Sequence, residues 1–277
     1  MRGITAELLV LRKRASTKVL LGIWVSLGIM FSHLLPYLTY RGGADGPGRA
    51  LLQALLPASL ADNLLAGFPF FGGVFALMLG VLAVGSDYGW NTLKTLLTQR
   101  SGRLGIFGSK LAALAVALIP FVVVIFVTGA VAAYLIAQAE DMAVLWPSTW
   151  EVARALAAGW FVLATWAALG VLLAVVSRGT GLAIGLGILY TFVIEGLLSA
   201  LAGQISRLDA LVEYFLRANA YSLVTALGVP TDALADNGPG GFFGPFVGAT
   251  QAIVVMSAYG VCFLVLSAIL LRRRDVT

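Results

Sequence analysis

Residues that could do chemistry are few in this chain. It has one histidine, His33, and one cysteine, Cys262, and charged residues make up 11% of its 277 residues. No histidine, cysteine and acidic residues share metal-ligand or catalytic spacing. The stretch GIFGSK (105–110) lacks the G-x-x-x-x-G-K-[ST] spacing of a phosphate-binding loop. We therefore expect no catalytic centre, no cofactor or metal bound by this chain and no ATP hydrolysis by it.

Glu195 is an ionisable residue inside a long apolar run, 181–203. An ionised carboxylate deep in a bilayer costs about 2.5–3.5 kcal/mol on insertion scales, so this side chain should face protein or water. Two roles stay open at this point. Glu195 either lines a substrate path or accepts hydrogen bonds from Tyr or Ser groups of a neighbouring helix and so fixes the assembly.

A second polar feature is the stretch SDYGWNTLKTLLTQRSGR (86–103), which lies between two long apolar runs. Ser86 or Asp87 can cap the N-terminus of a helix. Trp90, Leu93 and Leu97 would then share one face of it. A short helix with an apolar ridge and basic flanks can rest on lipid. It can also dock into a groove on a soluble partner.

The elements that must position these residues are six apolar runs. Mean hydropathy is +0.96, and each run has the roughly 20 residues that a helix needs to cross a bilayer. The sequence therefore predicts an all-α polytopic membrane protein with a single transmembrane domain over residues 1–277 and spans at about 19–40, 64–86, 108–136, 153–176, 181–203 and 247–271.

Lysine and arginine predict the orientation, because cytoplasmic loops are enriched in them. With a cytoplasmic N-terminus, 13 of the 18 fall on the cytoplasmic side: Arg2, Arg12, Lys13, Arg14, Lys18, Lys94, Arg100, Arg103, Lys110, Arg178, Arg272, Arg273 and Arg274. We expect a multi-pass protein of a bacterial cytoplasmic membrane with both termini in the cytoplasm. Residues 1–17 combine apolar and basic residues and predict an interfacial helix on inner-leaflet lipid.

The link before the last run, 204–246, is long enough to carry structure of its own. Leu208, Leu211, Val212, Phe215 and Leu216 recur at helical spacing and predict one amphipathic helix on the external side. Such a helix would lie on the outer surface or dip partway into the bilayer; the alternative is a lid over the bundle with no part in transport. Glycine and proline then interrupt any helix in the rest of the link.

The stretch DYGWNTLKTLLTQRSGRLGIFGSKLAA (87–113) resembles the cytoplasmic segment of ABC-2 type permeases, the membrane subunits of ATP-binding-cassette exporters. The ending LLRRRDVT is also similar to the end of that family's last span. Asn91 replaces the family's usual glycine, and Arg100 and Gly102 stand where proline and serine are common. The positions that match the family's pattern are Asp87, Thr92, Leu93, Leu96, Leu97, Thr98, Arg103 and Lys110.

The resemblance implies that this segment is a coupling helix seated in a cleft of an ATPase subunit. Two copies of that separate subunit would bind ATP and Mg, and a second permease copy or a paralogue would complete the exporter; no nucleic acid is expected. The implied coupling residues are Asp87, Trp90, Thr92, Leu93, Lys94, Leu96, Leu97, Arg100 and Arg103. The alternatives are a non-transporting subunit that anchors or senses for a complex, and a secondary transporter.

Small residues at four-residue spacing mark two spans where helices can approach closely. In the second span Gly72, Ala76 and Gly80 predict packing within the chain. In the fifth, Gly181 and Gly185 form a G-x-x-x-G. The resemblance implies a dimer interface there with the first span, and packing within the chain is the alternative.

The predicted topology can be tested with single cysteines in a Cys262→Ser background. A cysteine at Thr98 should be shielded from membrane-impermeant thiol reagents in intact cells, whereas one at Asp236 should be labelled. Labelling of position 98 from outside would contradict the six-span topology.

Overall fold

The structure, a computed structural model, describes residues 2–43, 48–89, 102–202, 206–229 and 246–273. These residues form helices joined by short connections, and no strand occurs among them. Six helical segments are long and apolar enough to cross a membrane, and they agree with the six predicted runs: Ala15–Arg41, Phe68–Tyr88, Leu104–Ala139, Thr149–Ser177, Gly181–Ala202 and Ala249–Arg273. The chain is an all-α polytopic membrane protein.

Three spans are single α-helices: α8 (Arg103–Ala139), α9 (Thr149–Ser177) and α15 (Ala249–Arg273). Each of the other three spans contains a π-helical turn. The first span consists of α2 (Ala15–Ile29), the π-turn η1 (Met30–Leu34) and α3 (Leu35–Arg41), and the second of the π-turn η3 (Phe68–Gly72) and α6 (Gly73–Gly89). The fifth span consists of α10 (Gly181–Ile188), the π-turn η4 (Leu189–Glu195) and α11 (Gly196–Ala202). Shorter elements complete the chain: α1 (Arg2–Lys13), α4 (Gly48–Leu55), the 3-10 turn η2 (Pro57–Ser59), α5 (Leu60–Leu65), α12 (Ser206–Val212) and α13 (Leu216–Thr225).

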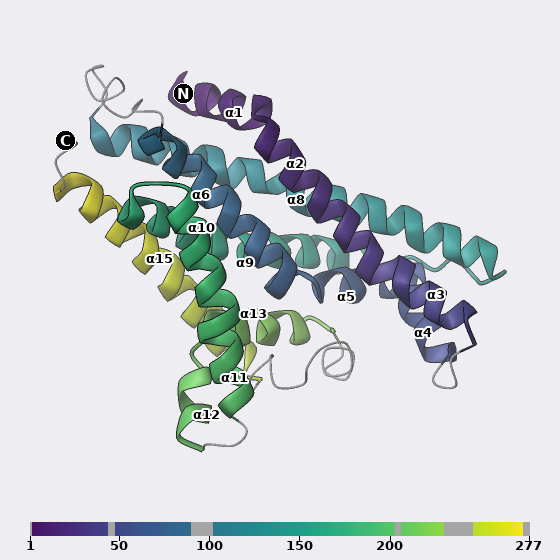
Figure 1. Cartoon of the computed structure of the whole chain (residues 1–277). Helices are drawn as coiled ribbons and strands as arrows, with labels where there is room; N and C mark the ends of the chain where they lie inside the picture. The colour runs from purple at the N-terminus through teal and green to yellow at the C-terminus, as the bar shows by residue number, and fades with distance from the viewer. Residues whose placement is uncertain (1, 44–47, 90–101, 203–205, 230–245, 274–277) are drawn as a thin grey trace.

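One end of the bundle, which we call the terminal end, holds α1 and the last turn of α15 (Figure 1). Helix α6 ends there and α8 begins there. From this end α2 and α8 run in one direction with α6 beside them, while α10 and α15 diverge from them toward α12 (Figure 1). We call the end where α3 and α4 lie the distal end (Figure 1). Both ends of the chain thus lie on one side of the bundle, and the side of the membrane that this end faces stays a prediction.

Helices α6 and α9 make the closest approach in the bundle. A Cβ atom added to Gly80 would collide with the backbone carbonyl of Ala167, and one added to Gly170 would collide with that of Leu77. A Cβ on Gly72 would lie 3.0 Å from the side chain of Leu163. The small residues of the second span therefore pack within the chain, as predicted, because glycine lets two backbones touch.

The three π-helical turns are linked by phenylalanine rings. Phe31 of η1 stacks on Phe71 of η3 with ring centroids 5.1 Å apart, and Phe70 meets Phe192 of η4 edge-on at 5.3 Å. Single π-turns interrupt an α-helix by one extra residue. These three spans thus share an irregular turn at the places where they contact one another.

The predicted interfacial helix over 1–17 is shorter than expected. Helix α1 ends at Lys13 and the first span begins at Ala15, because Arg14 has an extended backbone (φ −68°, ψ 126°). The Arg14 guanidinium turns toward α6 and donates a 2.6 Å hydrogen bond to the carbonyl of Leu82. That contact accompanies the change in chain direction between α1 and α2.

The prediction of one amphipathic helix before the last span is wrong. The chain forms two helices, α12 and α13, separated by a turn at 213–215 in which Phe215 is extended (φ −68°, ψ 146°). Every residue of Leu216–Val224 is buried, so α13 is packed inside the bundle on all sides. Its first N–H groups bond to a carboxylate from another span, as described below.

The contact between α6 and α9 should not tolerate a side chain. We expect Gly80→Ala and Gly170→Ala each to lower the free energy of unfolding by about 1–3 kcal/mol, because the obstacle is backbone rather than a flexible side chain. Gly260→Ala is the matched control, since a Cβ there meets nothing within 4 Å. Thermal unfolding in detergent, followed by circular dichroism, measures the difference. Equal melting temperatures in all three variants would contradict the close approach.

Candidate functional site

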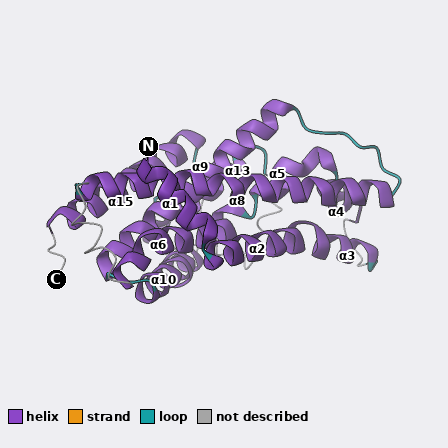
Figure 2. Cartoon of the chain, turned by 90° about the horizontal axis from the view of Figure 1, so that it is seen from above, coloured by secondary structure: helices purple, strands orange, loops and turns teal. Residues whose placement is uncertain are grey.

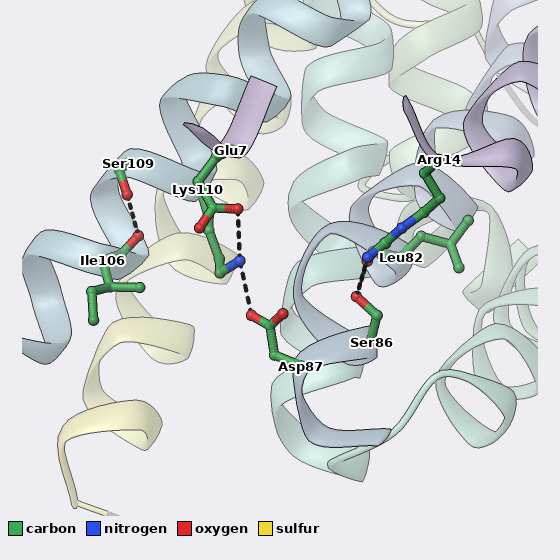
Figure 3. A network of polar contacts seen from close by, with 8 residues as sticks. All are labelled: Glu7, Arg14, Leu82, Ser86, Asp87, Ile106, Ser109 and Lys110. Carbon is green, nitrogen blue, oxygen red and sulfur yellow. Dashed lines mark hydrogen bonds and ion pairs between the residues drawn. The ribbon is translucent and has the colours of Figure 1, made fainter. Parts of the chain in front are cut away.

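A buried lysine joins three helices at the terminal end. The Lys110 ammonium, on α8, lies 2.8 Å from a carboxylate oxygen of Glu7 on α1 and 2.8 Å from one of Asp87 on α6 (Figure 3). The three side chains are between 8% and 18% exposed. Charge-assisted bonds shielded from water are stronger than surface ion pairs, so this cluster holds α1, α6 and α8 together.

A second cation reinforces the contact between α1 and α6. Arg14, just beyond the last residue of α1, donates to the carbonyl of Leu82 and, at 2.9 Å, to the hydroxyl of Ser86 (Figure 3). Ser86 in turn donates to the Leu82 carbonyl at 2.8 Å. The last turn of α6 is thus bonded on two sides, to α8 through Asp87 and to the start of α2 through Arg14.

This cluster flanks the predicted coupling segment on both sides. Asp87 lies in the last turn of α6, and α8 begins at Arg103, whose side chain the structure does not describe. The other predicted coupling residues lie outside the described residues: Trp90, Thr92, Leu93, Lys94, Leu96, Leu97 and Arg100. Of the predicted set, the structure therefore places only the two ends.

Two members of the cluster were not predicted from the sequence. Glu7 is the one acidic residue among positions 1–17, in a stretch that is otherwise basic and apolar. This isolation could have marked Glu7 as a site residue, because a single acidic residue on a basic interfacial helix suggests a buried cationic partner. Arg14 gave no such signal, since it stands among Arg12, Lys13 and Lys18.

Glu195 forms a second polar cluster, deep in the bundle and fully buried. Its carboxylate accepts a 2.7 Å hydrogen bond from the Tyr190 hydroxyl and bonds of 2.9 and 3.3 Å from the backbone N–H groups of Leu216 and Arg217. Those N–H groups open α13, so the carboxyl group of Glu195 lies at the positive end of that helix. Glu195 thereby joins η4 to α13, and its role in a substrate path stays a prediction.

Arg217 is also buried, with 1% of its surface exposed. Its guanidinium donates to the carbonyl of Thr191 at 3.3 Å and lies over the ring of Phe70 at 6.0 Å. The arginine therefore contacts both η3 and η4 from the first turn of α13. With Glu195, it ties this buried helix to two spans.

The fifth span's glycine pair is not used for packing within the described chain. A Cβ on Gly181 or on Gly185 would meet no atom within 4 Å. In the second span, by contrast, a Cβ on Gly72 or Gly80 would meet α9. The face that carries Gly181 and Gly185 is open, and its use in a dimer remains a prediction.

A cavity of about 220 Å³ opens at the distal end between α5, the start of α9 and the turn after α13. Asp62, Glu151 and Arg154 line it together with small and apolar side chains. Burial raises the pKa of the Asp62 carboxyl and the nearby Glu151 raises it further, while Arg154 lowers it. This cavity lies at the opposite end of the bundle from the Lys110 cluster.

If the Lys110 cluster holds the three helices together by charge, variants of its residues should differ in stability in a specific order. Lys110→Met leaves two carboxylates close together with no ammonium between them, and we expect a loss of about 3 kcal/mol or more. Lys13 is exposed, so Lys13→Met is the control and should change the free energy of unfolding little. Adding Glu7→Gln and Asp87→Asn to Lys110→Met removes the buried charge and should restore part of the loss. Thermal unfolding of the four proteins checks this; a triple variant no better than Lys110→Met would contradict an electrostatic cause.

Comparison with known proteins identifies a family for this chain. No curated protein matches the chain. A family model described as a protein of unknown function, DUF2705, matches residues 7–277, a range that contains Glu7, Asp87, Lys110 and Glu195. The match covers nearly the whole chain, and the chain therefore belongs to the DUF2705 family.

Proposed function

We propose that this chain is the membrane-spanning permease subunit of an ATP-binding-cassette exporter, driven by a separate ATPase subunit. The observation that carries the proposal is the 2.8 Å ion pair between Asp87 and Lys110. Both residues belong to the pattern that resembles ABC-2 type permeases. They stand on either side of the predicted coupling segment and connect the helices that enter and leave it.

Such a cluster suits a segment that receives force. If α6 and α8 were not bonded to each other, the segment between them could move while the two helices stayed in place. Because the ion pair joins α6 to α8, a displacement of the segment would move both helices together. Helix α6 touches α9 backbone to backbone at Gly80 and Gly170. A push at the terminal end would therefore reach α9, because close-packed helices shift as units.

In this proposal the chain contributes no catalytic group. Two ATPase subunits would bind ATP and Mg and close on each other, and the coupling segments of two permease chains would follow them. The second permease chain would be a copy or a paralogue, in a bacterial cytoplasmic membrane with the terminal end in the cytoplasm. The open face at Gly181 and Gly185 supports such a pairing.

The decisive experiment compares two variants of the coupling segment. Trp90→Ala with Leu93→Ala removes the apolar ridge, and aromatic anchors of this kind often carry 2 kcal/mol or more of binding energy. We expect at least a 30-fold weaker retention of the ATPase on co-purification from native cells. Lys94→Ala, a rim charge worth about 0–1 kcal/mol, should stay within several-fold of the wild type.

Two outcomes would contradict the proposal. A double variant that keeps its ATPase, with fully substrate-stimulated hydrolysis in liposomes, would mean that this segment does not couple. A wild-type chain that brings down no ATPase would favour a subunit that anchors or senses for a complex without transport.

A further inference from the structure

The longest helix is too long to stand upright in a bilayer. Helix α8 has 37 residues and is therefore about 55 Å long, whereas a bilayer is about 40–45 Å thick with its headgroups. A helix of this length tilts or protrudes, and residues that anchor its two ends decide which. The Lys110 cluster holds α8 near its start.

The far end of α8 is bonded to α3. Glu140, directly after α8, accepts hydrogen bonds from the hydroxyls of Tyr37 at 2.8 Å and Tyr40 at 3.2 Å and pairs with Arg41 at 3.1 Å. Ile136 of α8 packs with Leu52 and Leu55 of α4 in a small separate core. These contacts hold the distal end of α8 against α3 and α4, and so fix where the following segment of chain begins.

That chain crosses to α9 as an extended loop at 142–148, which stands clear of the helices (Figure 2). The turn into it is made by Asp141 with φ 50°. Its largest apolar side chains do not fold back onto the bundle: Leu145 is 66% exposed, Trp146 52% and Trp150, in the first turn of α9, 72%. Three large apolar residues exposed on one short loop and the helical turn that follows it need an apolar surface to cover them.

The part of α8 that leads toward the loop also carries exposed apolar side chains. Val127, Val131 and Leu135 recur every four residues along one face of α8 and are 55–59% exposed. On a membrane-spanning helix such a stripe contacts lipid. The stripe ends about one turn before the end of α8, so the loop follows a lipid-facing part of the chain.

The charges around the loop indicate which lipid feature it would contact. Glu140, Asp141 and Glu151 flank it, with Arg154 one turn further along α9. A basic patch would favour anionic headgroups, but this neighbourhood is net acidic. Tryptophan rings partition to the headgroup level because one edge is apolar and the N–H is polar.

We propose that residues 142–150 form a membrane anchor that inserts Leu145, Trp146 and Trp150 into the headgroup region of the leaflet at the distal end. This anchor needs no anionic lipid. Together with the Glu140 contacts it fixes the distal end of α8 at the membrane surface and so sets the tilt of that helix. It is independent of any ATPase partner.

Nitroxide labels on single cysteines in a Cys262→Ser background test the anchor. The full chain is reconstituted in phosphatidylcholine vesicles, and each label is compared for collision with oxygen, which concentrates in lipid, and with a water-soluble nickel chelate. At Leu145 the ratio of oxygen to nickel collisions should exceed that at Gln53, on the exposed face of α4, at least threefold. It should be lower than at Val131, deeper on the lipid-facing stripe.

Two results would overturn the anchor. A ratio at Leu145 equal to that at Gln53 would place the loop in water. Protection from both reagents would mean that another protein or a second copy covers it.

A second variant tests the effect on α8. Leu145→Asp with Trp146→Ser should raise the nickel accessibility of a label at Leu135 at least twofold, because the distal end would leave the headgroup region. Ala143→Ser, in the same loop, is the control. The changed side chains are exposed, so the melting temperature should not move. Unchanged accessibility at Leu135 would show that the loop does not set the tilt.

Discussion

The backbone contact between α6 and α9 is the constraint on which the other helices depend. In the apolar stretches of these two spans 72% and 67% of the residues are buried, against 11% in the first span and 17% in the last. Lipid is as apolar as leucine, so helices in a membrane gain little from burying apolar surface and associate where small residues allow close packing. Gly80 and Gly170 provide that packing, and the remaining spans are arranged around the pair.

The polar groups follow a second common rule. An ionisable side chain removed from water must find its partners within the protein. Lys110 meets that need with two carboxylates from other helices, and Glu195 with a hydroxyl and the first N–H groups of α13. In both places the cost of burying an ionisable group is offset by bonds that join elements distant in the sequence. The same groups therefore define how the helices are assembled.

The six spans could be predicted because a bilayer imposes a minimum length on each apolar run. The break between α12 and α13 could not be predicted from the sequence. It depends on Glu195, more than 20 residues earlier, because this side chain accepts hydrogen bonds from the first N–H groups of α13. The same holds for the Lys110 cluster: Asp87 was predicted as a site residue, but Lys110 can pair with both Asp87 and Glu7 only once three helices meet. The spacing of residues along the chain predicts where helices form, but which polar residues meet in a cluster depends on contacts between helices.

The π-helical turns have a consequence for the surface of the spans that contain them. Successive residues in an α-helix are rotated by about 100°, and a π-turn inserts one residue. The face that begins at Gly181 and Gly185 therefore does not continue in a straight line past η4; the residues of α11 are turned by roughly a quarter of the circumference. The two leaflets of the membrane thus meet different faces of the fifth span, so each half of that span is free to acquire its own neighbour.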